Sequence, residues 1–521
     1  MSNVTTVAEA RPDHPAVIFG NGETEISYGE LERSSRRLAH MLRSLGVAPG
    51  DGIAVMVGNE PLFFDAYWAA MRLGIYFTPV NWHLQDAEVQ YIVDNCDAKV
   101  FIASGDFAGV AGAAAKGVPE SVIRLCNGGD IPGFRRLEDA LADVPEDTEL
   151  PDQLEGQTML YSSGTTGFPK GVRSRLSGKP AGDPSMGIAT RMSMEGLFGM
   201  SPDARYICPA PLYHAAPLAF TLAQHRLGNT AIVMRAFDPE EALRVIQDQQ
   251  VTASQWVPTH FRRMLQLPSE VRERYDVSSL TVAIHAAAPC PIPIKRAMID
   301  WWGPIIVEYY AGTEGGGTFI RSDEWLEHPG SVGRHWAGGT VHILDDEGVE
   351  ILKAGTEGAI YFDAPEDAAA RFRYHKDDSK TEQTYRGSRF TLGDIGYKDA
   401  DDYLFLTDRK SNMIISGGAN IYPQEVENHL ASHAKVEDVA VIGVPNDDFG
   451  EEVKAVVIPR DRSEAGAALE QELIDYCREG IAHFKCPRSI DFVDELPRTE
   501  TGKLVKRRLR DQYWADHDGR L

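Results

Sequence analysis

Helical and strand-like hydrophobic patterns alternate along the first hundred residues, and this alternation restricts what the chain can fold into. Ser27-Tyr-Gly-Glu30 is a capping box, in which the Ser27 hydroxyl and the Glu30 carboxylate close the first turn of a helix. Apolar residues then recur at helical spacing as far as Gly46, and Ile53–Val57 is an apolar run typical of a buried strand. The same order continues through Tyr91–Ile102. The predicted fold class is therefore α/β, with layered subdomains.

The length of the chain predicts more than one domain. At 521 residues it exceeds what one hydrophobic core usually holds together. After Asp408–Asn412, short patterns follow in the order strand, helix, strand, strand, helix, at Met413–Ser416, Glu425–Leu430, Val439–Gly443, Val453–Ile458 and Leu469–Ile481. They form a compact α+β unit of about 100 residues. We expect a large N-terminal domain at 1–408 and a small C-terminal domain at 409–521. Three stretches are predicted as connections, at Pro145–Gln157, Ser174–Pro184 and Asp363–Gly387.

Composition narrows the function classes. The formal charge of −25 argues against a general nucleic-acid binder, which needs a basic surface. The most apolar stretch, Val100–Val118, contains Asp106 and Lys116, so no membrane span is predicted. The N-terminus has no signal-peptide pattern, and the six cysteines form no CxxC pair. These features predict a reduced, cytoplasmic protein.

The most informative stretch is a glycine-rich loop that runs from Ser162 to Gly171. Its three glycines let the backbone approach an anion, its hydroxyls donate hydrogen bonds, and Lys170 adds a positive charge. The spacing differs from that of the G-x-x-x-x-G-K-[ST] phosphate loop. A polar turn without a ligand is the structural alternative, but such a density of donors beside a lysine is rare in plain turns. The loop therefore predicts phosphate binding. The net negative charge of the chain does not prevent it, because charges more than roughly 8 Å away are screened.

The loop resembles the phosphate-binding signature of the adenylate-forming superfamily, which includes acyl-CoA synthetases, peptide-synthetase adenylation domains and luciferases. Further segments resemble the other motifs of that superfamily in the expected order, so that the resemblance covers nearly the whole chain. They are Pro211-Leu-Tyr-His214, Tyr310-Ala-Gly-Thr-Glu314, Thr391-Leu-Gly-Asp-Ile-Gly396, which carries an inserted Leu, Asp408-Arg409 with Gly417-Gly418, and Pro497-Arg-Thr-Glu-Thr-Gly-Lys503.

The resemblance implies a fold and a nucleotide site. The large domain would be the adenylate-forming domain, and a mobile small domain would follow it in the sequence. ATP and Mg²⁺ would bind with Tyr310 stacked on adenine, Asp394 on the ribose hydroxyls and Glu314 on the metal. By the same resemblance, the residues that bind nucleotide or coenzyme A are Ser162, Ser163, Gly164, Thr165, Thr166, Gly167, Lys170, Ala287, Ala288, Tyr310, Thr313, Asp394, Arg409, Gly417 and Gly418.

The resemblance also assigns catalytic roles. Lys503 would bridge the substrate carboxylate and the α-phosphate, a task that suits a compact cation on a flexible stem. The other catalytic assignments are His214, Thr313, Glu314 and Arg409. Each has a structural alternative: a core histidine for His214, a core aromatic for Tyr310, surface or capping carboxylates for Glu314 and Asp394, a surface ion pair for Arg409 and a basic tail for Lys503.

A second half-reaction follows from the resemblance. The small domain would rotate, so that Gly417 and Gly418 replace Lys503 beside the acceptor thiol of coenzyme A. The hinge position is Ser411, where the superfamily usually has Asp or Lys. This departure weakens the hinge assignment, although a small polar residue can absorb such a change of backbone angles.

The substrate acid and its acceptor remain open at this stage. Relatives that activate amino acids place an aspartate in the pocket for the ammonium group, and the stretch after His214 contains no acidic residue. An acid without an α-amino group is therefore expected. Small residues at Ala215, Ala216, Ala286–Ala288 and Gly315–Gly317 suggest room for a bulky fatty, aromatic or steroid-like acid, although the three glycines can instead serve backbone geometry. His285 is a further candidate donor near the acyl or adenine site.

Three functions follow, in decreasing order of support. The first is an acid–CoA ligase of fatty acid metabolism that acts on a small-molecule carboxylic acid, ATP and coenzyme A. The second is an amide synthetase that passes the acyl-adenylate to an amine, and the third is a nucleotide-binding regulator without catalysis. A homodimer remains open, and no nucleic acid partner is expected.

Overall fold

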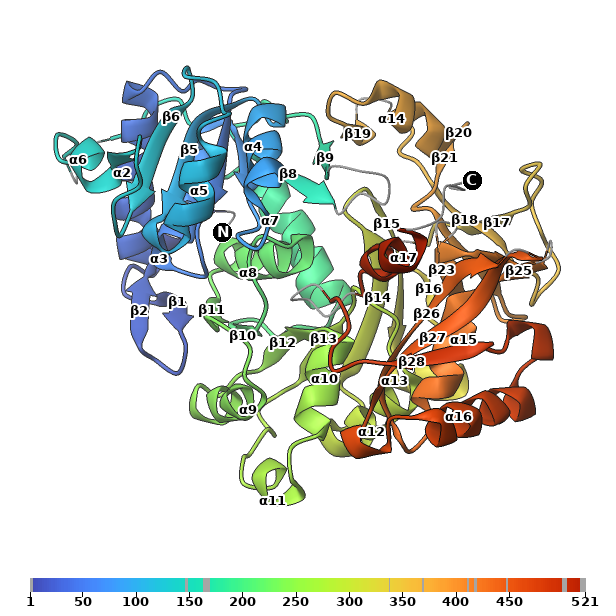
Figure 1. Ribbon diagram of the computed structural model, residues 1–521. Helices are drawn as coiled ribbons and strands as arrows, with labels where there is room; N and C mark the ends of the chain where they lie inside the picture. Colours follow the sequence, from blue (N-terminus) through green and yellow to red (C-terminus); the bar gives the residue numbers. More distant parts are fainter. Residues whose placement is uncertain are drawn as a thin grey trace.

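The computed structural model describes residues 3–145, 149–162, 169–336, 338–367, 370–409, 412–416, 419–446, 448–498 and 504–515, with the backbone alone at 162, 408, 409 and 420. Within these ranges the chain forms four β-sheets. Three sheets lie in a large N-terminal domain and the fourth in a small C-terminal domain (Figure 1). The predicted α/β class with a large and a small domain is therefore confirmed.

An eight-stranded sheet contains the strands on either side of the glycine-rich loop. Its order is β19 (Arg373–Tyr374), β9 (Lys170–Arg173), β8 (Gln157–Ser162), β4 (Tyr76–Pro79), β3 (Gly52–Met56), β5 (Ala98–Ser104), β6 (Ile123–Asn127) and β7 (Arg135–Arg136). The six strands from β8 to β7 pair in parallel, and β8, β9 and β19 pair antiparallel. Its helices are α2 (Tyr28–Ser44), α3 (Pro61–Leu73), α4 (Asp86–Asn95), α5 (Ala108–Ala114) and α6 (Leu137–Leu141). The predicted capping box is present, since the Glu30 backbone N–H donates to the Ser27 hydroxyl and the Ser27 N–H donates to the Glu30 carboxylate.

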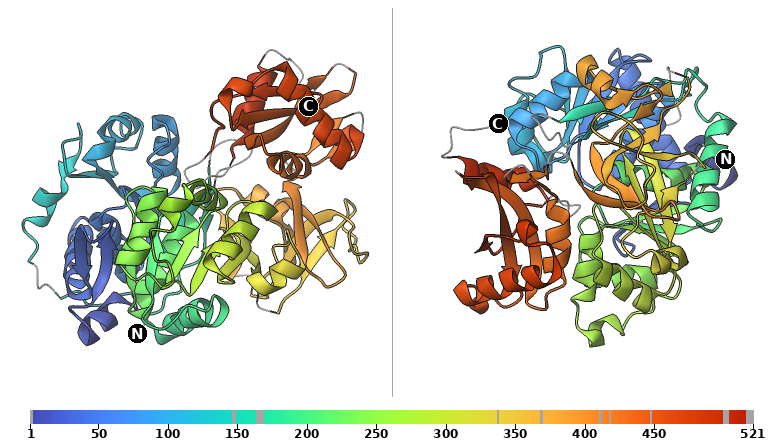
Figure 2. Two further views of the ribbon diagram at one scale, coloured as in Figure 1. Left: turned by 90° about the horizontal axis from the view of Figure 1, so that it is seen from below. Right: turned by 90° about the vertical axis from the view of Figure 1, so that its right-hand side faces the viewer.

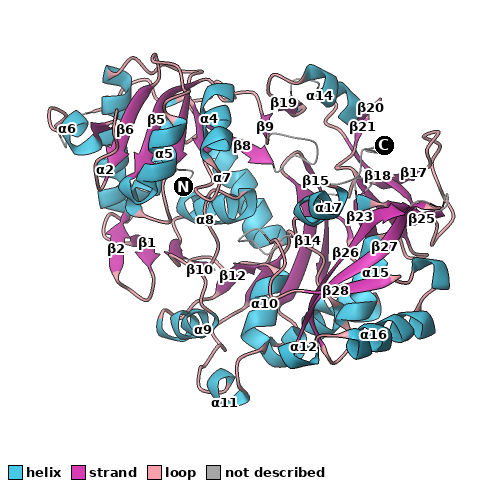
Figure 3. Ribbon diagram, in the orientation of Figure 1, coloured by secondary structure: helices cyan, strands magenta, loops and turns pink. Residues whose placement is uncertain are grey.

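A nine-stranded sheet forms the middle of the large domain. Its order is β16 (Arg334–His335), β15 (Gly315–Arg321), β14 (Ile306–Gly312), β13 (Val282–His285), β12 (Ala253–Trp256), β10 (Arg205–Cys208), β11 (Thr230–Val233), β1 (Pro15–Phe19) and β2 (Thr24–Ser27). The six strands from β14 to β1 are parallel, as expected for buried strands joined by helices. The associated helices are α1 (Val4–Ala10), α7 (Pro184–Arg191), α8 (Ala215–Leu227), α9 (Pro239–Asp248), α10 (Pro258–Leu265), α11 (Ser269–Arg272), α12 (Ile292–Trp302) and α13 (Ser322–Glu327). Helices lie against the faces of both large sheets (Figure 3).

A six-stranded sheet completes the large domain. Its strands are β20 (Tyr385–Arg386), β21 (Arg389–Phe390), β18 (Gly358–Asp363), β22 (Asp394–Lys398) and β23 (Leu404–Arg409), with β17 (Val341–Leu344) paired to β18. The short helix α14 (Asp378–Thr384) lies between β19 and β20. Asp363–Gly387, predicted as a connection, thus contains two short strands and a helix. The prediction was wrong because neither the helix nor the strand here requires hydrophobic periodicity. The helix begins at a cap, in which the Asp377 carboxylate accepts from the Lys380 N–H at 3.0 Å, and β19 forms because it pairs with β9.

The small domain is built on a five-stranded sheet. Its strands are β25 (Ala419–Ile421), β24 (Ile414–Ser416), β27 (Gly450–Pro459), β26 (Val436–Asn446) and β28 (Ser489–Phe492). Helices α15 (Pro423–Ala431) and α16 (Ala467–Gly480) pack together with one set of buried residues, and α17 (Lys506–Trp514) packs with another. Figure 2 shows this domain as a separate body against one face of the large domain. The predicted helices and strands of this unit are confirmed, with β26 and β27 longer than expected.

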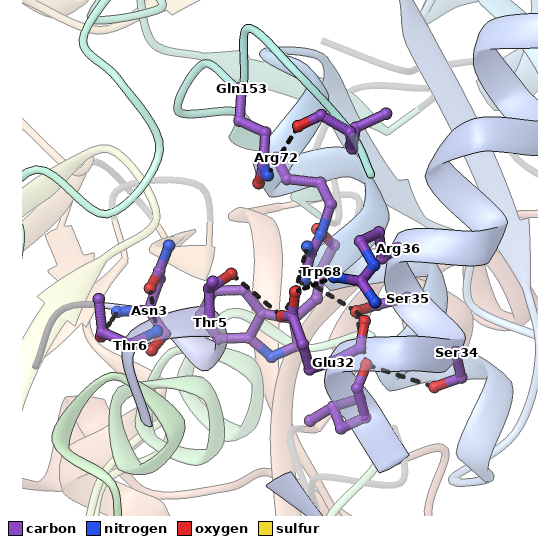
Figure 4. Close-up of polar contacts among 12 residues, drawn as sticks. Asn3, Thr5, Thr6, Glu32, Ser34, Ser35, Arg36, Trp68, Arg72 and Gln153 are labelled. Carbon is purple, nitrogen blue, oxygen red and sulfur yellow. Dashed lines mark hydrogen bonds and ion pairs between the residues drawn. The ribbon is translucent and has the colours of Figure 1, made fainter. Parts of the chain in front are cut away.

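A buried ion pair holds the first helices of the large domain together. The Arg72 guanidinium of α3 donates to both Glu32 oxygens of α2, at 3.0 and 2.8 Å, and to the Ser35 hydroxyl at 3.0 Å. The Thr5 hydroxyl of α1 donates to the same carboxylate at 3.0 Å (Figure 4). A buried charge pair is tolerated when further hydrogen bonds satisfy it, as they do here. This network fixes three helices relative to one another.

The sequence predicted no membrane span and reduced cysteines. The stretch Val100–Val118 is not a single span but contains β5 and α5, and none of the helices in the described ranges has the length and hydropathy to cross a membrane. The six cysteines, all at described positions, are free thiols.

Candidate active site

A tyrosine brings together two residues predicted to bind the nucleotide phosphates and the metal. The strands β14 and β15 are joined by Thr313 and Glu314. The Tyr374 hydroxyl of β19 donates to Glu314 Oε1 at 2.7 Å. Lys170 Nζ, at the first residue of β9, lies 5.7 Å from the centroid of the Tyr374 ring. A cation and a carboxylate from separate sheets therefore meet at one place.

The electrostatics of Lys170 suit an anion site. Partial burial lowers the pKa of its ammonium group, and nearby Lys380 adds to this effect, whereas Asp377 and Glu314 oppose it. Ser162 and Lys170 are register partners of β8 and β9. The two ends of the glycine-rich loop are thus fixed side by side, at the ends of β8 and β9.

A second contact joins the residues assigned to adenine and ribose. The Tyr310 hydroxyl of β14 donates to Asp394 Oδ2 of β22 at 2.5 Å, and Asp394 is largely buried. Asp394 is also the register partner of Arg409 in β23. The structure therefore brings together three positions separated by up to 99 residues in the sequence, although the Arg409 side chain lies outside the described residues.

His214 occupies the N-terminal end of α8. Its backbone is extended, with φ −85° and ψ 148°, and it is the N-cap residue of the helix. Its ring centroid lies 4.3 Å from that of Tyr213, which in turn packs edge-on against Trp82 at 4.5 Å. A helix N-terminus favours negative charge, so this position suits a site for a carboxylate substrate.

Most of the chain matches two known protein families. Residues 4–369 match the AMP-binding enzyme family, and residues 425–503 match the AMP-binding enzyme C-terminal domain. The chain belongs to the AMP-binding enzyme family. It lies in the acyl-CoA synthetase branch of the adenylate-forming superfamily, as the sequence motifs predicted.

Full-length relatives support this placement. The chain is 30% identical to the long-chain-fatty-acid–CoA ligase FadD13 of Mycobacterium tuberculosis, with 98% of this chain and 97% of the relative aligned. It is 32% identical to a feruloyl-CoA synthase of Amycolatopsis, over 97% of this chain and 98% of the relative. Among solved structures, the amide bond synthetase McbA of Marinactinospora thermotolerans superposes with a TM-score of 0.81 at 23% identity, over 98% of this chain and 99% of the other, which shows a shared fold.

The structure decides between the two interpretations of Gly315–Gly317. Gly315, Gly316 and Gly317 all have positive φ, at 113°, 70° and 155°. A Cβ on Gly316 would lie 2.7 Å from the Phe362 ring, and one on Gly317 would lie 2.4 Å from the Trp336 ring. Aromatic rings already fill the space beside these two glycines. The glycines therefore serve backbone geometry and close packing rather than leaving volume for the acid.

The structure places His285 in the core of the large domain. The ring has no solvent exposure and packs edge-on against Phe261 at 5.4 Å between centroids. Its Nε2 lies 3.6 Å from Glu308 Oε2, and that oxygen accepts from Lys295 Nζ at 2.6 Å. Burial, with Lys295 nearby, holds the pKa of His285 well below its usual value. His285 is the last residue of β13 and thus lies in the core, beside Glu308 of β14. The next residues of this segment, Ala287 with φ 77° and the half-buried Ala288, are more accessible.

Several assigned residues lie outside the described part of the chain. The base of the Lys503 loop is nevertheless defined, because Val505 donates to the Pro497 carbonyl at 2.7 Å and Arg498 forms a bridge with Leu504. The assigned positions outside the described residues are Ser163, Gly164, Thr165, Thr166, Gly167, Gly417, Gly418 and Lys503, as well as the hinge candidate Ser411 and the side chain of Ser162.

Sequence reasoning missed two groups of residues that shape the site. Tyr374 lies in the stretch predicted as a connection. The only sequence signal of a strand there is the spacing of the aromatic residues Phe372 and Tyr374, two positions apart, both of which the structure buries. The Lys295–Glu308 pair joins α12 to β14 across 13 residues, and no local pattern predicts which lysine meets which carboxylate.

Proposed function

We propose that the chain is an ATP-dependent acid–CoA ligase. A carboxylate oxygen of the substrate attacks the α-phosphorus of ATP, the bond to the β-phosphate breaks, and acyl-AMP and pyrophosphate form. The thiol of coenzyme A then attacks the acyl carbon, and AMP leaves. The contact of Tyr374 with both Lys170 and Glu314 carries this proposal, because it assembles groups for a phosphate chain beside the fixed ends of the glycine-rich loop.

Each described residue takes a task that its position supports. Lys170 binds the β- and γ-phosphates, Asp394 accepts hydrogen bonds from the ribose, and Tyr310 packs against adenine while its hydroxyl holds Asp394 in place. Glu314 would hold Mg²⁺, since a carboxylate is an oxygen ligand suited to a hard cation, and the bound ion would neutralise phosphate charge. Tyr374 holds the Glu314 carboxylate in place through its hydroxyl.

The remaining roles come from the motif match and stay proposals. Lys503 bridges the substrate carboxylate and the α-phosphate, and Arg409 contacts the sugar–phosphate region. Thr313 binds the α-phosphate, and His214 lies between acid and nucleotide. The small domain, from 409 onward, rotates about a position near Ser411 between the two half-reactions and brings Gly417 and Gly418 to the thiol.

The substrate is proposed to be an acid with an apolar body and no α-amino group. The segment after His214 is Ala215-Ala-Pro-Leu-Ala-Phe220, without a carboxylate for an ammonium group. An aromatic cluster lies along β14, with the ring of Phe198 5.0 Å from Phe220, 5.6 Å from Tyr309 and 5.8 Å from Phe319. The relatives activate long-chain fatty acids and ferulate, both of which fit this description. A reducing, cytoplasmic location with Mg²⁺ belongs to the same proposal.

A screen of pyrophosphate release tests the proposal. Purified protein is incubated with ATP, Mg²⁺ and fatty, aromatic or steroidal acids, with and without coenzyme A, and the products are identified by mass spectrometry. We expect pyrophosphate with at least one acid, and the thioester only when coenzyme A is present. Lys503→Ala should abolish adenylation but still transfer the acyl group from pre-made acyl-adenylate, whereas the exposed control Lys353→Ala should behave as the parent.

Two outcomes would contradict the proposal. Absence of pyrophosphate with every acid would exclude adenylation. An amide formed with an added amine, together with no thioester at saturating coenzyme A, would identify an amide synthetase instead.

A further inference from the structure

A cavity of about 460 Å³ with a basic lining lies next to the expected phosphate site. Half of the ten residues around it are Arg or Lys, whereas the whole chain has 52 such residues among 521. The cations come from β9, from the turn after it and from the segment around β19, at Arg173, Arg175, Arg371, Arg373 and Lys376. We call this cavity the basic pocket. Such a concentration of positive charge is unexpected in a chain with a formal charge of −25.

The carboxylates near the basic pocket balance only part of this charge. Asp378 pairs with Arg373 at 3.1 Å, and Asp97 pairs with Lys376 at 2.7 Å. Within the described ranges, Arg173, Arg175 and Arg371 form no ion pair with a carboxylate. Like charges this close repel one another, so a bound anion would lower the energy of the arrangement.

One guanidinium in the pocket is held rigidly. Arg173 lies over the Tyr76 ring, 4.0 Å from its centroid, and donates to His375 Nδ1 at 3.2 Å. His375 Nε2 in turn donates to Asp97 Oδ2 at 2.9 Å, so its Nδ1 is the acceptor and a single neutral tautomer satisfies both contacts. The Tyr76 hydroxyl donates to the Ser174 carbonyl at 3.0 Å, which fixes the backbone beside Arg173. A fixed guanidinium with more exposed cations around it suits recognition of phosphate oxygens.

The basic pocket is connected to the active site through one strand and one side chain. β9 begins at Lys170, beside the glycine-rich loop, and ends at Arg173, which lines the pocket. Tyr374 also lines the pocket, and its hydroxyl contacts Glu314. The pocket therefore lies beside the β9–β19 pair, within one side chain of the site proposed for the phosphates of ATP.

From this geometry we infer that the basic pocket is a second anion site, which binds a diphosphate group separately from the ATP site. The inference rests on the proposed function, because the two reaction components that could supply this group besides ATP are released pyrophosphate and the diphosphate of coenzyme A. The cavity is within the size range of ligand sites, about 300–1,000 Å³, and so accommodates a diphosphate with attached groups or water.

Calorimetric titration of the full-length protein tests this inference. The ATP site is first saturated with α,β-methylene-ATP, and pyrophosphate or coenzyme A is then titrated separately. We expect one remaining site, weakened about tenfold or more in Arg371→Gln/Arg373→Gln, since charge-assisted hydrogen bonds are lost. The matched control is Arg244→Gln/Arg274→Gln, which removes the same charge from the region of α9 and α11, far from β19 (Figure 1). If the double variant unfolds, Arg373→Gln alone serves, because that side chain is exposed.

The outcomes separate the two sources and the two proposals. Pyrophosphate binding without coenzyme A binding identifies a product site, and coenzyme A binding that pyrophosphate displaces identifies the coenzyme's diphosphate. The inference is overturned if neither ligand binds the loaded protein, if coenzyme A binds without competition from pyrophosphate, or if the variants and the parent bind equally. A protein that binds neither ATP analogue nor acid would instead contradict the proposed ligase function.

Discussion

Charged side chains are used differently inside the domains and at the contact between them. Inside the domains, ion pairs are buried, as in Arg72–Glu32 and Lys295–Glu308 of the large domain and Lys506–Glu427 of the small domain. The contact between the domains is more open to solvent: Arg262 of α10 donates to the Glu437 carbonyl at 3.1 Å and pairs with Asp438 at 3.1 Å. The first arrangement fixes elements within a domain, and the second is a contact that the proposed domain movement would have to break.

This difference matches what each region has to do. Glu314 and Asp394 are held by tyrosine hydroxyls within the large domain, and in the proposed mechanism they would therefore need no rearrangement when a nucleotide binds. The small domain, in the proposed mechanism, must leave one position and adopt another. A few polar contacts at its boundary allow such a movement at low cost, because partly exposed ion pairs contribute little stability.

The largest expected effect comes from breaking the buried pair behind the site. Glu308→Gln leaves Lys295, which has no solvent exposure, without its charge partner. Removal of one member of such a pair costs about 3–5 kcal/mol. Chemical denaturation should show this loss. The exposed pair of the small domain provides the control, since Lys435→Met should change stability little.

The Glu308 result has a clear contrary outcome. If Glu308→Gln and Lys435→Met destabilise the protein equally, burial does not determine what a charge pair contributes to stability. The double variant Lys295→Met/Glu308→Gln should recover part of the loss, because no unpaired charge remains in the core.

The next largest effect is expected on catalysis, at the Glu314 carboxylate that Tyr374 holds in place. Glu314→Gln keeps the shape of the side chain but removes its charge, and we expect pyrophosphate release to fall about 10²–10³-fold, the range for loss of one preorganised electrostatic group. Initial rates at saturating ATP measure this. Glu347→Gln, at an exposed carboxylate, is the control. Full activity of Glu314→Gln would place the metal and phosphate chain elsewhere.

The layered fold could be predicted because its signals are local. The Ser27–Glu30 capping box and the apolar run at Ile53–Val57 correspond directly to α2 and β3. The motif residues Tyr310 and Asp394 could be assigned to one site from resemblance alone, and the structure places them in contact.

The sequence could not predict contacts that depend on long-range pairing. Tyr374 meets Glu314 across 60 residues because β19 pairs with β9, and two-residue strands carry no periodic signal. The sequence left open whether Gly316 and Gly317 provide space for the acid or serve backbone geometry, and only the structure shows that the rings of Phe362 and Trp336 lie against them. Which large residue fills the space beside a small one is decided by tertiary packing, which a single sequence does not encode locally.

Acidification should destabilise the large domain through its buried histidines. Burial lowers the pKa of His225 and of His260 to about 3. Because these pKa values are depressed, the stability they contribute is complete above pH about 6.5 and is lost as the pH falls toward 3, at up to about 1.4 kcal/mol per pH unit for each. Burial also raises the pKa of Asp65 to about 6, so acidification from pH about 6 to about 4 stabilises the folded state through this group. The two histidines outweigh it.

Calorimetric melting at pH 7.5, 6.5 and 5.5 measures this dependence. His225 accepts from the Trp68 indole N–H at 3.1 Å and donates to the Ala16 carbonyl at 3.1 Å, so it is locked in one neutral tautomer. His225→Gln should lower stability at pH 7.5 but flatten the slope below it, whereas the exposed His83→Gln should leave the slope unchanged. An unaltered slope in His225→Gln would show that its protonation is not linked to unfolding.

The smallest effect on stability should come from the contact between the domains, where the functional effect is the informative one. Asp438 accepts two hydrogen bonds from Arg498, at 2.9 and 2.8 Å, as well as pairing with Arg262. Asp438 thus contacts the large domain through Arg262 and, within the small domain, Arg498, which lies five residues before Lys503 in the sequence. Arg262→Ala leaves the Asp438–Arg498 pair intact, so the free energy of unfolding should change by about 1 kcal/mol or less.

Arg262→Ala should nevertheless change the ratio of the two half-reactions, because it removes a contact of the present domain arrangement that the proposed rotation would break. Pyrophosphate release and thioester formation from pre-made acyl-adenylate, assayed separately, should move in opposite directions by about two- to fivefold, which corresponds to about 0.4–1 kcal/mol of differential stabilisation. Arg263→Ala is the matched control, since the neighbouring Arg263 stacks on Phe237 of the large domain, 5.0 Å from its centroid. If both half-reactions fell together in Arg262→Ala, the contact would serve the fold of the large domain, and the contrast between a fixed site and a movable domain would need another basis.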